Sequence, residues 1–244
     1  MMNPIAFNLF GLSVRWYGVI ITLGILISGY IAILNAKRVN IKADDITDYM
    51  LIAMPFCIIG ARLYYVFFQW EYYKGDILKI INTREGGLAI HGGIIAGILV
   101  AYFYCKRRKI KFLEFFDIIC VSIPLGQSIG RWGNFTNSEA YGTPTNLPWA
   151  IEINGNMVHP TFLYESLWNF ILFIFLMRLF RRKKFDGQII SLYLIIYSVG
   201  RFFIEYLRTD ALMIMGLRTA QITSIILILS GACLYLFCKK RKKD

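Results

Sequence analysis

Long apolar segments recur along the whole chain, and they restrict its fold more than any other feature. An α-helix rises about 1.5 Å per residue, so about 20 apolar residues cross the hydrocarbon core of a bilayer. Segments of this kind cover residues 17–36, 46–70, 86–105, 112–129, 161–180, 188–207 and 219–238. Only 17% of the residues are charged, whereas soluble domains carry about a quarter. The sequence therefore predicts an all-α polytopic membrane protein with seven transmembrane helices, in one integral membrane domain over residues 1–244.

The basic residues predict which way these helices run. Most of the 27 Lys and Arg residues follow every second segment, in clusters at 37–42, 106–111, 181–184 and 239–243. Because Lys and Arg gather on the cytoplasmic side of membrane proteins, we expect the N-terminus outside and the C-terminus in the cytoplasm. The net charge of +12 then orients the chain and holds anionic membrane lipids, and nucleic acid is not an expected partner. Residues 1–10 carry no positive charge ahead of their apolar residues, as a cleavable signal peptide would, so the first segment should itself direct insertion.

One connection is long enough to fold as a small unit outside the membrane, and another has a distinctive composition. Residues 135–160, between the fourth and fifth spans, contain turn-forming prolines and glycines and predict a small extracytoplasmic head. Within it, the alternating residues 149–153 followed by Asn-Gly predict a short hairpin. Residues 71–85 are rich in aromatic residues and predict an arm that lies in the membrane interface.

A polar block, GRWGNFTNSEAYG at 130–142, follows the fourth apolar segment directly. Polar groups at membrane depth are costly unless they are paired, and they mark functional sites by default. An arginine beside amide and hydroxyl donors suits an anionic lipid headgroup, although a polar surface loop would have the same composition. Glycines at 126, 130, 133 and 142 should let neighbouring backbones approach closely.

The sixth segment also carries charge. Tyr197, Arg201, Glu205 and Arg208 are spaced by four, four and three residues, which places them on one helical face. A simple ion pair between Arg201 and Glu205 would explain two of these charges. It would not explain a second arginine, Arg131, at the end of another span.

Other polar residues in apolar segments leave alternatives open. His91 lies in GGLAIHGG, where the glycines leave room for a ligand beside the ring, but a structural histidine is equally compatible. Arg62 needs a partner, either a lipid phosphate or a carboxylate such as Glu165. Glu114 and Asp117 begin the fourth span and should complement its helix dipole. The five cysteines have no metal-site spacing, so we expect no metal ligands and mostly buried thiols.

The polar block resembles the signature of the prolipoprotein diacylglyceryl transferase family, G-R-x-G-N-F-x-N-x-E-x-x-G, at every fixed position. Further similar segments are Trp16-Tyr17-Gly18, GGLAIHGG at 86–93, HPTFLYE at 159–165 and residues 197–210, so the resemblance covers the whole chain. It implies an essential or substrate-contacting set made of Tyr17, His91, Arg131, Asn134, Glu139, Gly142, Tyr197, Arg201 and Arg208, with Asn137 fixed by the motif.

The resemblance also implies a reaction in the bacterial cytoplasmic membrane, with the active site toward the extracytoplasmic side. The diacylglyceryl group of phosphatidylglycerol would move to the lipobox cysteine thiol of a prolipoprotein signal peptide, forming a thioether and releasing glycerol 1-phosphate. Arg131 and Arg201 would hold the phosphate, and His91 is the candidate base. Glu139 and Tyr17 would position these groups, and the substrate contacts would come from Arg131, Asn134, Asn137, Gly142, Tyr197 and Arg208. No metal or redox cofactor is expected.

Two other classes of protein share some of these features. An anionic lipid or solute transporter would use the same arginines in a central cavity, but it should show repeat symmetry or paired broken helices. Neither pattern is visible in the sequence. A membrane scaffold without chemistry would leave the clustered polar residues unexplained.

Overall fold

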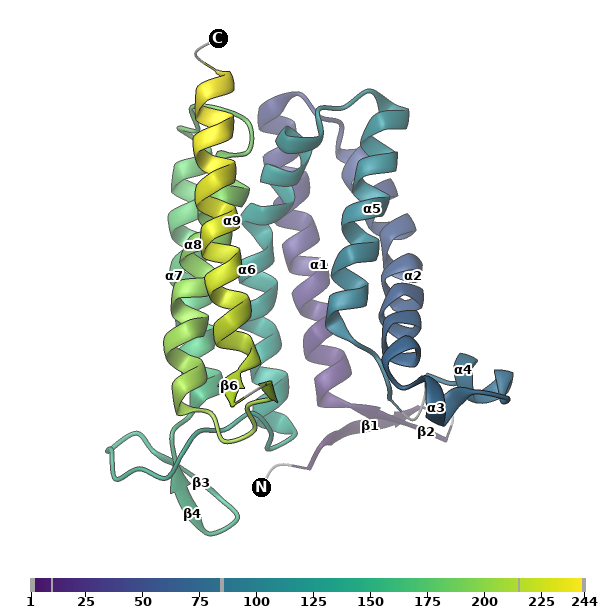
Figure 1. The fold of residues 1–244 in the computed structure, drawn as a ribbon, viewed down its shortest axis with the longest axis vertical. Coiled ribbons are helices and arrows are strands. Elements are labelled where there is room, and N and C mark those ends of the chain that lie inside the picture. Colours follow the sequence, from purple (N-terminus) through teal and green to yellow (C-terminus); the bar gives the residue numbers. More distant parts are fainter. Residues whose placement is uncertain (1–2, 10, 84–85, 215, 243–244) are drawn as a thin grey trace. The chain divides into compact units, whose positions relative to one another are not determined.

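The computed structural model describes residues 3–9, 11–83, 86–214 and 216–242 (Figure 1). The chain divides into two compact units, and each is described by itself. The larger unit contains Met1–Ala32 and Phe116–Asp244, and the smaller unit contains Ile33–Phe115.

The larger unit is built from long helices with short hairpins at their connections (Figure 1). Its elements are β1 (Ile5–Leu9), β2 (Leu12–Arg15), α1 (Trp16–Ala36), α6 (Phe112–Thr136), β3 (Ile151–Ile153), β4 (Asn156–Val158), α7 (Thr161–Phe180), α8 (Gln188–Leu207), β5 (Met213–Ile214), β6 (Leu217–Arg218) and α9 (Thr219–Arg241). Helices α1 and α6 cross the boundary between the two units. The smaller unit continues with the 3-10 helix η1 (Lys37–Val39), then α2 (Ala43–Phe68), α3 (Trp70–Tyr73), α4 (Ile77–Ile81) and α5 (Ile90–Arg108).

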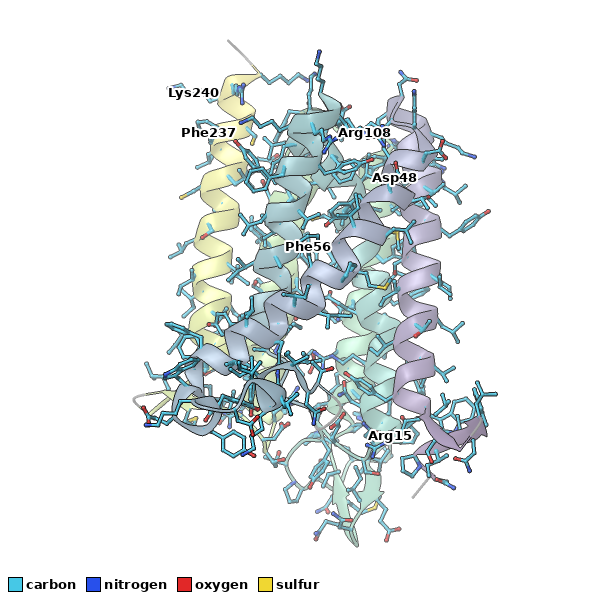
Figure 2. The ribbon with its side chains drawn as sticks, turned by 90° about the vertical axis from the view of Figure 1, so that its right-hand side faces the viewer. Arg15, Asp48, Phe56, Arg108, Phe237 and Lys240 are labelled. Atoms are coloured by element: carbon cyan, nitrogen blue, oxygen red, sulfur yellow. The ribbon has the colours of Figure 1, made fainter. Side chains whose placement is uncertain are left out.

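Six helices of the described chain are long and apolar enough to cross a membrane, which supports a polytopic membrane protein. They are α1 with η1, α2, α6, α7, α8 and α9. Helix α5, expected as the third span, is not among them. It has 19 residues, and it ends in the basic residues Lys106, Arg107 and Arg108. Many apolar side chains of these helices are exposed, among them Phe56 and Phe237, which are labelled in Figure 2.

Helix bounds agree with the apolar segments at some ends and differ at others. Helices α7 and α8 have the predicted bounds. Helix α6 continues past residue 129 to Thr136, so half of the polar block is helical. Helix α5 begins at Ile90 and not at Gly86, because Gly86 and Gly87 have φ values of 91° and 75°, outside the helical region.

Close contacts at glycine join α1 to α6 in the larger unit. A Cβ on Gly24 would lie 3.3 Å from the carbonyl oxygen of Gly126, and one on Gly130 would lie 3.1 Å from Ile21 Cδ1. Ser128 and Ser166 each donate a hydroxyl hydrogen bond to the other's carbonyl at 2.9 Å, which joins α6 to α7. Small and hydroxyl residues serve this purpose between membrane helices, and the predicted close backbone approach is confirmed.

Asp117 is fully buried, but it complements a different helix dipole from the one expected. Its carboxylate accepts the backbone N–H groups of Gly187, Ile189 and Ile190, at 2.9, 3.0 and 3.1 Å. These groups lie at the start of α8, where unpaired N–H donors attract a negative charge. Asp117 therefore fixes the start of α8, the helix that carries Arg201.

The predicted hairpin in residues 149–156 is confirmed. Strands β3 and β4 pair antiparallel, and the turn residues Asn154 and Gly155 have φ values of 53° and 79°. The hairpins β1–β2 and β5–β6 were not predicted, because their strands are only two to five residues long.

In the smaller unit, α2 and α5 also meet at glycines. A Cβ on Gly60 would lie 2.7 Å from the carbonyl oxygen of Gly92, and Tyr49 donates its hydroxyl to the Gly97 carbonyl at 3.2 Å. The basic end of α5 is fixed by Arg108, whose Nη2 lies 2.6 Å from the Asp48 carboxylate (Figure 2).

The predicted arm at 71–85 contains α3 and α4, and its residues 84 and 85 lie outside the described part of the chain. Ile77, Leu78 and Ile81 of this arm are exposed.

Candidate active site

The polar block begins on the last turns of α6 and ends in a tight turn. The backbone N–H of Glu139 donates to the carbonyl of Asn134 at 3.1 Å. Ser138 and Ala140 have left-handed φ values of 53° and 57°. The chain therefore reverses at the end of the helix and brings Glu139 back beside Asn134.

The side chains of the block form one hydrogen-bonded chain. Arg131 donates from Nη1 to Asn134 Oδ1 at 3.2 Å, and Asn134 donates from Nδ2 to Glu139 Oε1 at 3.1 Å. Asn137 donates from Nδ2 to the same carboxylate oxygen of Glu139 at 3.3 Å. Four of the candidate residues are thus brought together. Glu139 orients the two amides, and Asn134 orients the guanidinium of Arg131.

Helix α8 supplies the second arginine. Arg201 Nη2 lies 2.7 Å from Glu205 Oε2, so the ion pair between these residues is confirmed. One turn earlier, Tyr197 stacks on Tyr193 with ring centroids 5.5 Å apart. Arg208 lies just beyond the last helical residue in an extended conformation, so the common helical face holds only as far as Glu205.

The two arginine-bearing elements meet at Glu165 of α7, which is only 3% exposed. Arg131 Nη2 lies 2.6 Å from Oε2 of Glu165, and Arg201 Nη1 donates to Oε1 at 2.7 Å. Arg208 Nη1 also donates to Oε1, at 3.3 Å. One buried carboxylate therefore holds three guanidinium groups from different parts of the chain. We call Arg131, Arg201, Arg208, Glu165 and Glu205 the arginine cluster.

The ion pairs of the cluster are not all aligned as hydrogen bonds. Oε2 of Glu165 and Oε2 of Glu205 are buried and have no hydrogen-bond partner among the described residues, although an arginine nitrogen lies within 2.7 Å of each. A short contact without alignment gives electrostatic attraction but not the full directional energy of a hydrogen bond. At these two oxygens the attraction to Arg131 and Arg201 is therefore chiefly electrostatic.

Arg208 is held from two further sides. Its Nε and Nη2 donate to both oxygens of Asp210, at 2.9 and 2.6 Å. Partial burial acts against the Asp210 charge, but these hydrogen bonds and the charge of Arg208 outweigh it, so the pKa of Asp210 lies below its usual range. Arg218 donates to the backbone carbonyls of Glu205 and Arg208, which fixes the chain where it leaves α8.

Gly142 and Tyr17 contribute through packing. A Cβ on Gly142 would lie 2.7 Å from His159 Cβ and 3.0 Å from the Leu207 carbonyl oxygen. Gly142 also forms a β-bridge with Arg208, so its close approach sets the backbone of that arginine. Tyr17, at the start of α1, lies against Gly133, where a Cβ would be 2.9 Å from Tyr17 Cδ2.

His91 belongs to the smaller unit. It lies in the first turn of α5, it is exposed, and its ring centroid is 6.0 Å from that of Tyr64.

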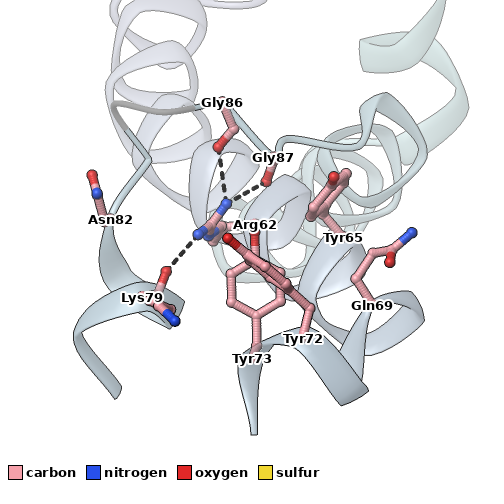
Figure 3. A pocket seen from close by; sticks show the side chains of 9 residues that line it. All are labelled: Arg62, Tyr65, Gln69, Tyr72, Tyr73, Lys79, Asn82, Gly86 and Gly87. Atoms are coloured by element: carbon pink, nitrogen blue, oxygen red, sulfur yellow. Dashed lines mark hydrogen bonds between the residues drawn. The ribbon is translucent and has the colours of Figure 1, made fainter. Parts of the chain in front are cut away.

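Arg62 also belongs to the smaller unit, and its partners there are backbone carbonyls. It donates from Nε to Ile80 at 2.8 Å and from Nη2 to Lys79 at 2.6 Å. Nη1 donates to the carbonyls of Gly86 and Gly87, at 2.9 and 2.8 Å (Figure 3). Beside it lies a cavity of about 350 Å³ lined by residues of α2 and the arm. Arg62 thus ties the arm to α2.

Metal ligands are not gathered anywhere in the described residues as groups of three or more His, Cys, Asp or Glu side chains.

Comparison with known proteins identifies the family of the chain. The sequence profile of the family described as prolipoprotein diacylglyceryl transferase matches residues 4–237. The chain belongs to this family.

Several curated relatives, named phosphatidylglycerol–prolipoprotein diacylglyceryl transferase, match over nearly their full length. The relative from Finegoldia magna is 52% identical over 241 residues, which cover 98% of this chain and 97% of the relative. The relative from Clostridioides difficile is 49% identical over 243 residues, which cover 100% and 98%. One from Clostridium botulinum is 49% identical over 253 residues, which cover 99% and 100%. These names support a transferase and give no support to the transporter alternative.

Glu165 was not among the predicted site residues. From the sequence, Glu165 is a candidate only as a partner for Arg62. A signal for it existed, because a carboxylate inside an apolar helix must have a charged partner. The sequence could not show that three arginines, far apart along the chain, share this partner.

Proposed function

We propose that this protein transfers the diacylglyceryl group of phosphatidylglycerol to the thiol of a lipobox cysteine in a prolipoprotein. Membership of the prolipoprotein diacylglyceryl transferase family supports the reaction class. The structural observation that carries the proposal is the convergence of Arg131, Arg201 and Arg208 in a largely buried cluster. Guanidinium groups are suited to phosphate because they donate two parallel hydrogen bonds.

The proposed reaction exchanges one bond for another. The cysteine thiol loses its proton to a base, and the sulfur electron pair forms a C–S bond to the glyceryl carbon that carries the phosphate. The C–O bond at that carbon breaks, and its electron pair remains on the phosphate oxygen. The products are a thioether-linked diacylglyceryl cysteine and glycerol 1-phosphate.

The arginines act where negative charge develops. The phosphate group of the lipid has one negative charge, and the departing monoester has about two at pH 7. Arg131 and Arg201 would donate to its oxygens in a site that excludes most water, where such donors are worth more than in solvent. Glu139, through Asn134, would keep Arg131 oriented. Arg208, Asn137, Gly142 and Tyr197 would complete the substrate contacts.

The thiol must also be activated. A cysteine thiol has a pKa of about 8.5, so a base or a cationic neighbour must favour the thiolate. His91 is our candidate base, on the basis of the family resemblance, and Tyr17 is a candidate for positioning. No metal or redox group is part of the proposal.

We further propose seven spans, with α5 as the third, the N-terminus and the head at 135–160 outside, and the C-terminus in the cytoplasm. Helix α5 would be about 28 Å long at 1.5 Å per residue, close to the thickness of the hydrocarbon core. Basic residues occupy the last turns of both α5 and α9, as the positive-inside rule requires for helix ends in the cytoplasm. The cluster would then lie toward the extracytoplasmic side of the cytoplasmic membrane.

Incubation of the purified protein with phosphatidylglycerol and a lipobox peptide tests the function. We expect a peptide whose mass increases by one diacylglyceryl group on cysteine, together with one equivalent of glycerol 1-phosphate. A peptide with serine in place of the cysteine is the matched control and should remain unmodified. Movement of lipid between vesicles without modified peptide would refute the proposal and indicate a transporter.

A further inference from the structure

Glu165 has a property that the proposed phosphate contacts do not explain. It is the only residue of the described arginine cluster that contacts all three of its arginines. Glu205, the other buried carboxylate, lies 2.7 Å from Arg201 and 3.9 Å from Arg208. A substrate phosphate would have to share these guanidinium groups with Glu165.

The burial of its side chains shows which charges of the cluster are poorly screened by water. The side chains of Arg131, Arg201 and Arg208 are 23%, 17% and 10% exposed, and those of the two glutamates are 3% exposed. Three positive and two negative charges leave one positive charge. Asp210 also bonds to Arg208 through both of its carboxylate oxygens, but it is 49% exposed, so water screens its charge more than the charges of the two buried glutamates.

The net charge of the cluster matches the phosphodiester of the lipid substrate better than the phosphate monoester of the product. A phosphodiester with one negative charge would neutralise the cluster, whereas a phosphate monoester with about two would leave it negative. An enzyme gains nothing by holding its product tightly, because release then limits turnover. A cluster without the charge of Glu165 would instead match the monoester.

We infer that Glu165 is a positioning residue that holds the three arginines in place and sets their net charge to favour the phosphodiester headgroup over the phosphate monoester. Glu165 acts on the substrate only through the arginines. This inference rests on the proposed function, since it assigns a task to the same cluster.

The test compares the binding of two soluble anions in the absence of peptide, so that no turnover occurs. Glycerophosphoglycerol is the monoanion and glycerol 1-phosphate is the dianion, and each is measured by displacement of a fluorescent phosphatidylglycerol in detergent. The wild type should bind the dianion no more tightly than the monoanion. In Glu165→Gln, the preference should move toward the dianion by about ten- to hundredfold, because one buried negative charge is lost.

Three comparisons separate charge from structure. Glu165→Asp keeps the charge and should keep the wild-type preference, even where its shorter side chain lowers kcat. Glu152→Gln, on the exposed side of β3, is the matched control and should change nothing. A Glu165→Gln protein that binds both anions more weakly by the same factor would have lost only structure, and that result overturns the inference.

The inference stays testable if Glu165→Gln fails to fold. A wild type that already binds the dianion tenfold more tightly than the monoanion would refute it without any variant. Failure of the proposed function is a separate result, because it appears as the absence of thioether product from the wild type. The anion preference is measured independently of that product.

Discussion

Nη2 of Arg131, at the end of α6, lies 2.6 Å from Oε2 of Glu165, inside α7. This contact joins two segments that the sequence analysis identified separately, the polar block at 130–142 and HPTFLYE at 159–165. Because Arg201 occupies the other oxygen of the same carboxylate, the contact also connects the polar block to α8. A carboxylate buried among apolar helices is stable only with such partners, so the cluster depends on all of its members.

The first prediction concerns the planar fork of the arginines. Replacing Arg131 or Arg201 with Lys keeps the charge but removes the bidentate donor geometry. We expect the rate of thioether formation to fall about a hundredfold for either variant, the usual scale for the loss of one transition-state donor. Arg178→Lys, at the exposed end of α7, is the matched control and should keep wild-type activity. Near-full turnover of both cluster variants would mean that charge alone suffices.

The second prediction concerns Gly142. In Gly142→Ala the new Cβ would lie 2.7 Å from His159 Cβ and 2.9 Å from Thr161 Cγ2, so the start of α7 must shift. Overpacking of this kind costs about 1–3 kcal/mol, and we expect lower thermal stability together with lower activity. Gly18→Ala is the matched control, because a Cβ there has no neighbour within 4 Å. An unchanged melting temperature in Gly142→Ala would show that the neighbouring atoms move aside at little cost in stability.

The sequence predicted the helices well because their apolar lengths are set by the membrane. Helices α7 and α8 were placed to the residue, since charged or turn-forming residues follow both. Helix α6 was ended too early at residue 129, because the polar block looked like a loop. Its residues remain helical as far as Thr136 because their polar side chains bond to one another.

The candidate site was only partly visible in the sequence. Spacing along α8 predicted the pair of Arg201 and Glu205, because residues four apart share a helical face. Spacing along one helix cannot show the partners of Glu165, because its three arginines lie 34 or more positions away along the chain. Arg62 was expected to bind a phosphate or a carboxylate, yet it donates to four backbone carbonyls, those of Lys79, Ile80, Gly86 and Gly87. The order of side chains in a sequence does not reveal hydrogen bonds to backbone carbonyls.

The third prediction tests this role of Arg62. Four carbonyls surround its guanidinium, and a lysine ammonium cannot reach all of them. Arg62→Lys should therefore loosen residues 71–83, because each hydrogen bond from a charged donor that is lost costs about 1.5–3 kcal/mol. Faster hydrogen exchange in this segment is the measurement. Lys79→Gln is the matched control, since only the backbone carbonyl of Lys79 contacts Arg62. Unchanged exchange in Arg62→Lys would contradict the role.

The fourth prediction concerns the orientation in the membrane. Single cysteines at positions 107, 145 and 183, in a protein without other cysteines, report the side on which each position lies. An impermeant thiol reagent added to intact cells should label only position 145, in the proposed extracytoplasmic head. Permeabilised cells provide the control and should show labelling at all three positions. Labelling at 107 in intact cells would overturn the proposed arrangement, because the basic end of α5 would then lie outside.

The last prediction tests His91 as the base. If its imidazole takes the thiol proton, His91→Asn should lower the rate of thioether formation by about 10²–10⁴. Binding of phosphatidylglycerol should change little, because a neutral imidazole contributes weakly to holding an anion. The acidic limb of the pH–rate profile should also disappear, since that limb reports protonation of the base.

A purely structural His91 makes a different set of predictions. It lies near Tyr64, and the loss of this contact would lower thermal stability while the pH profile stayed the same. Tyr64→Phe is the matched control, because it keeps the ring beside His91 and should leave the acidic limb in place. A His91→Asn protein with most of its activity and an unchanged acidic limb would remove His91 from the mechanism. The arginine cluster would then have to favour the thiolate by its positive charge, and the predictions for Arg131 and Arg201 would stand.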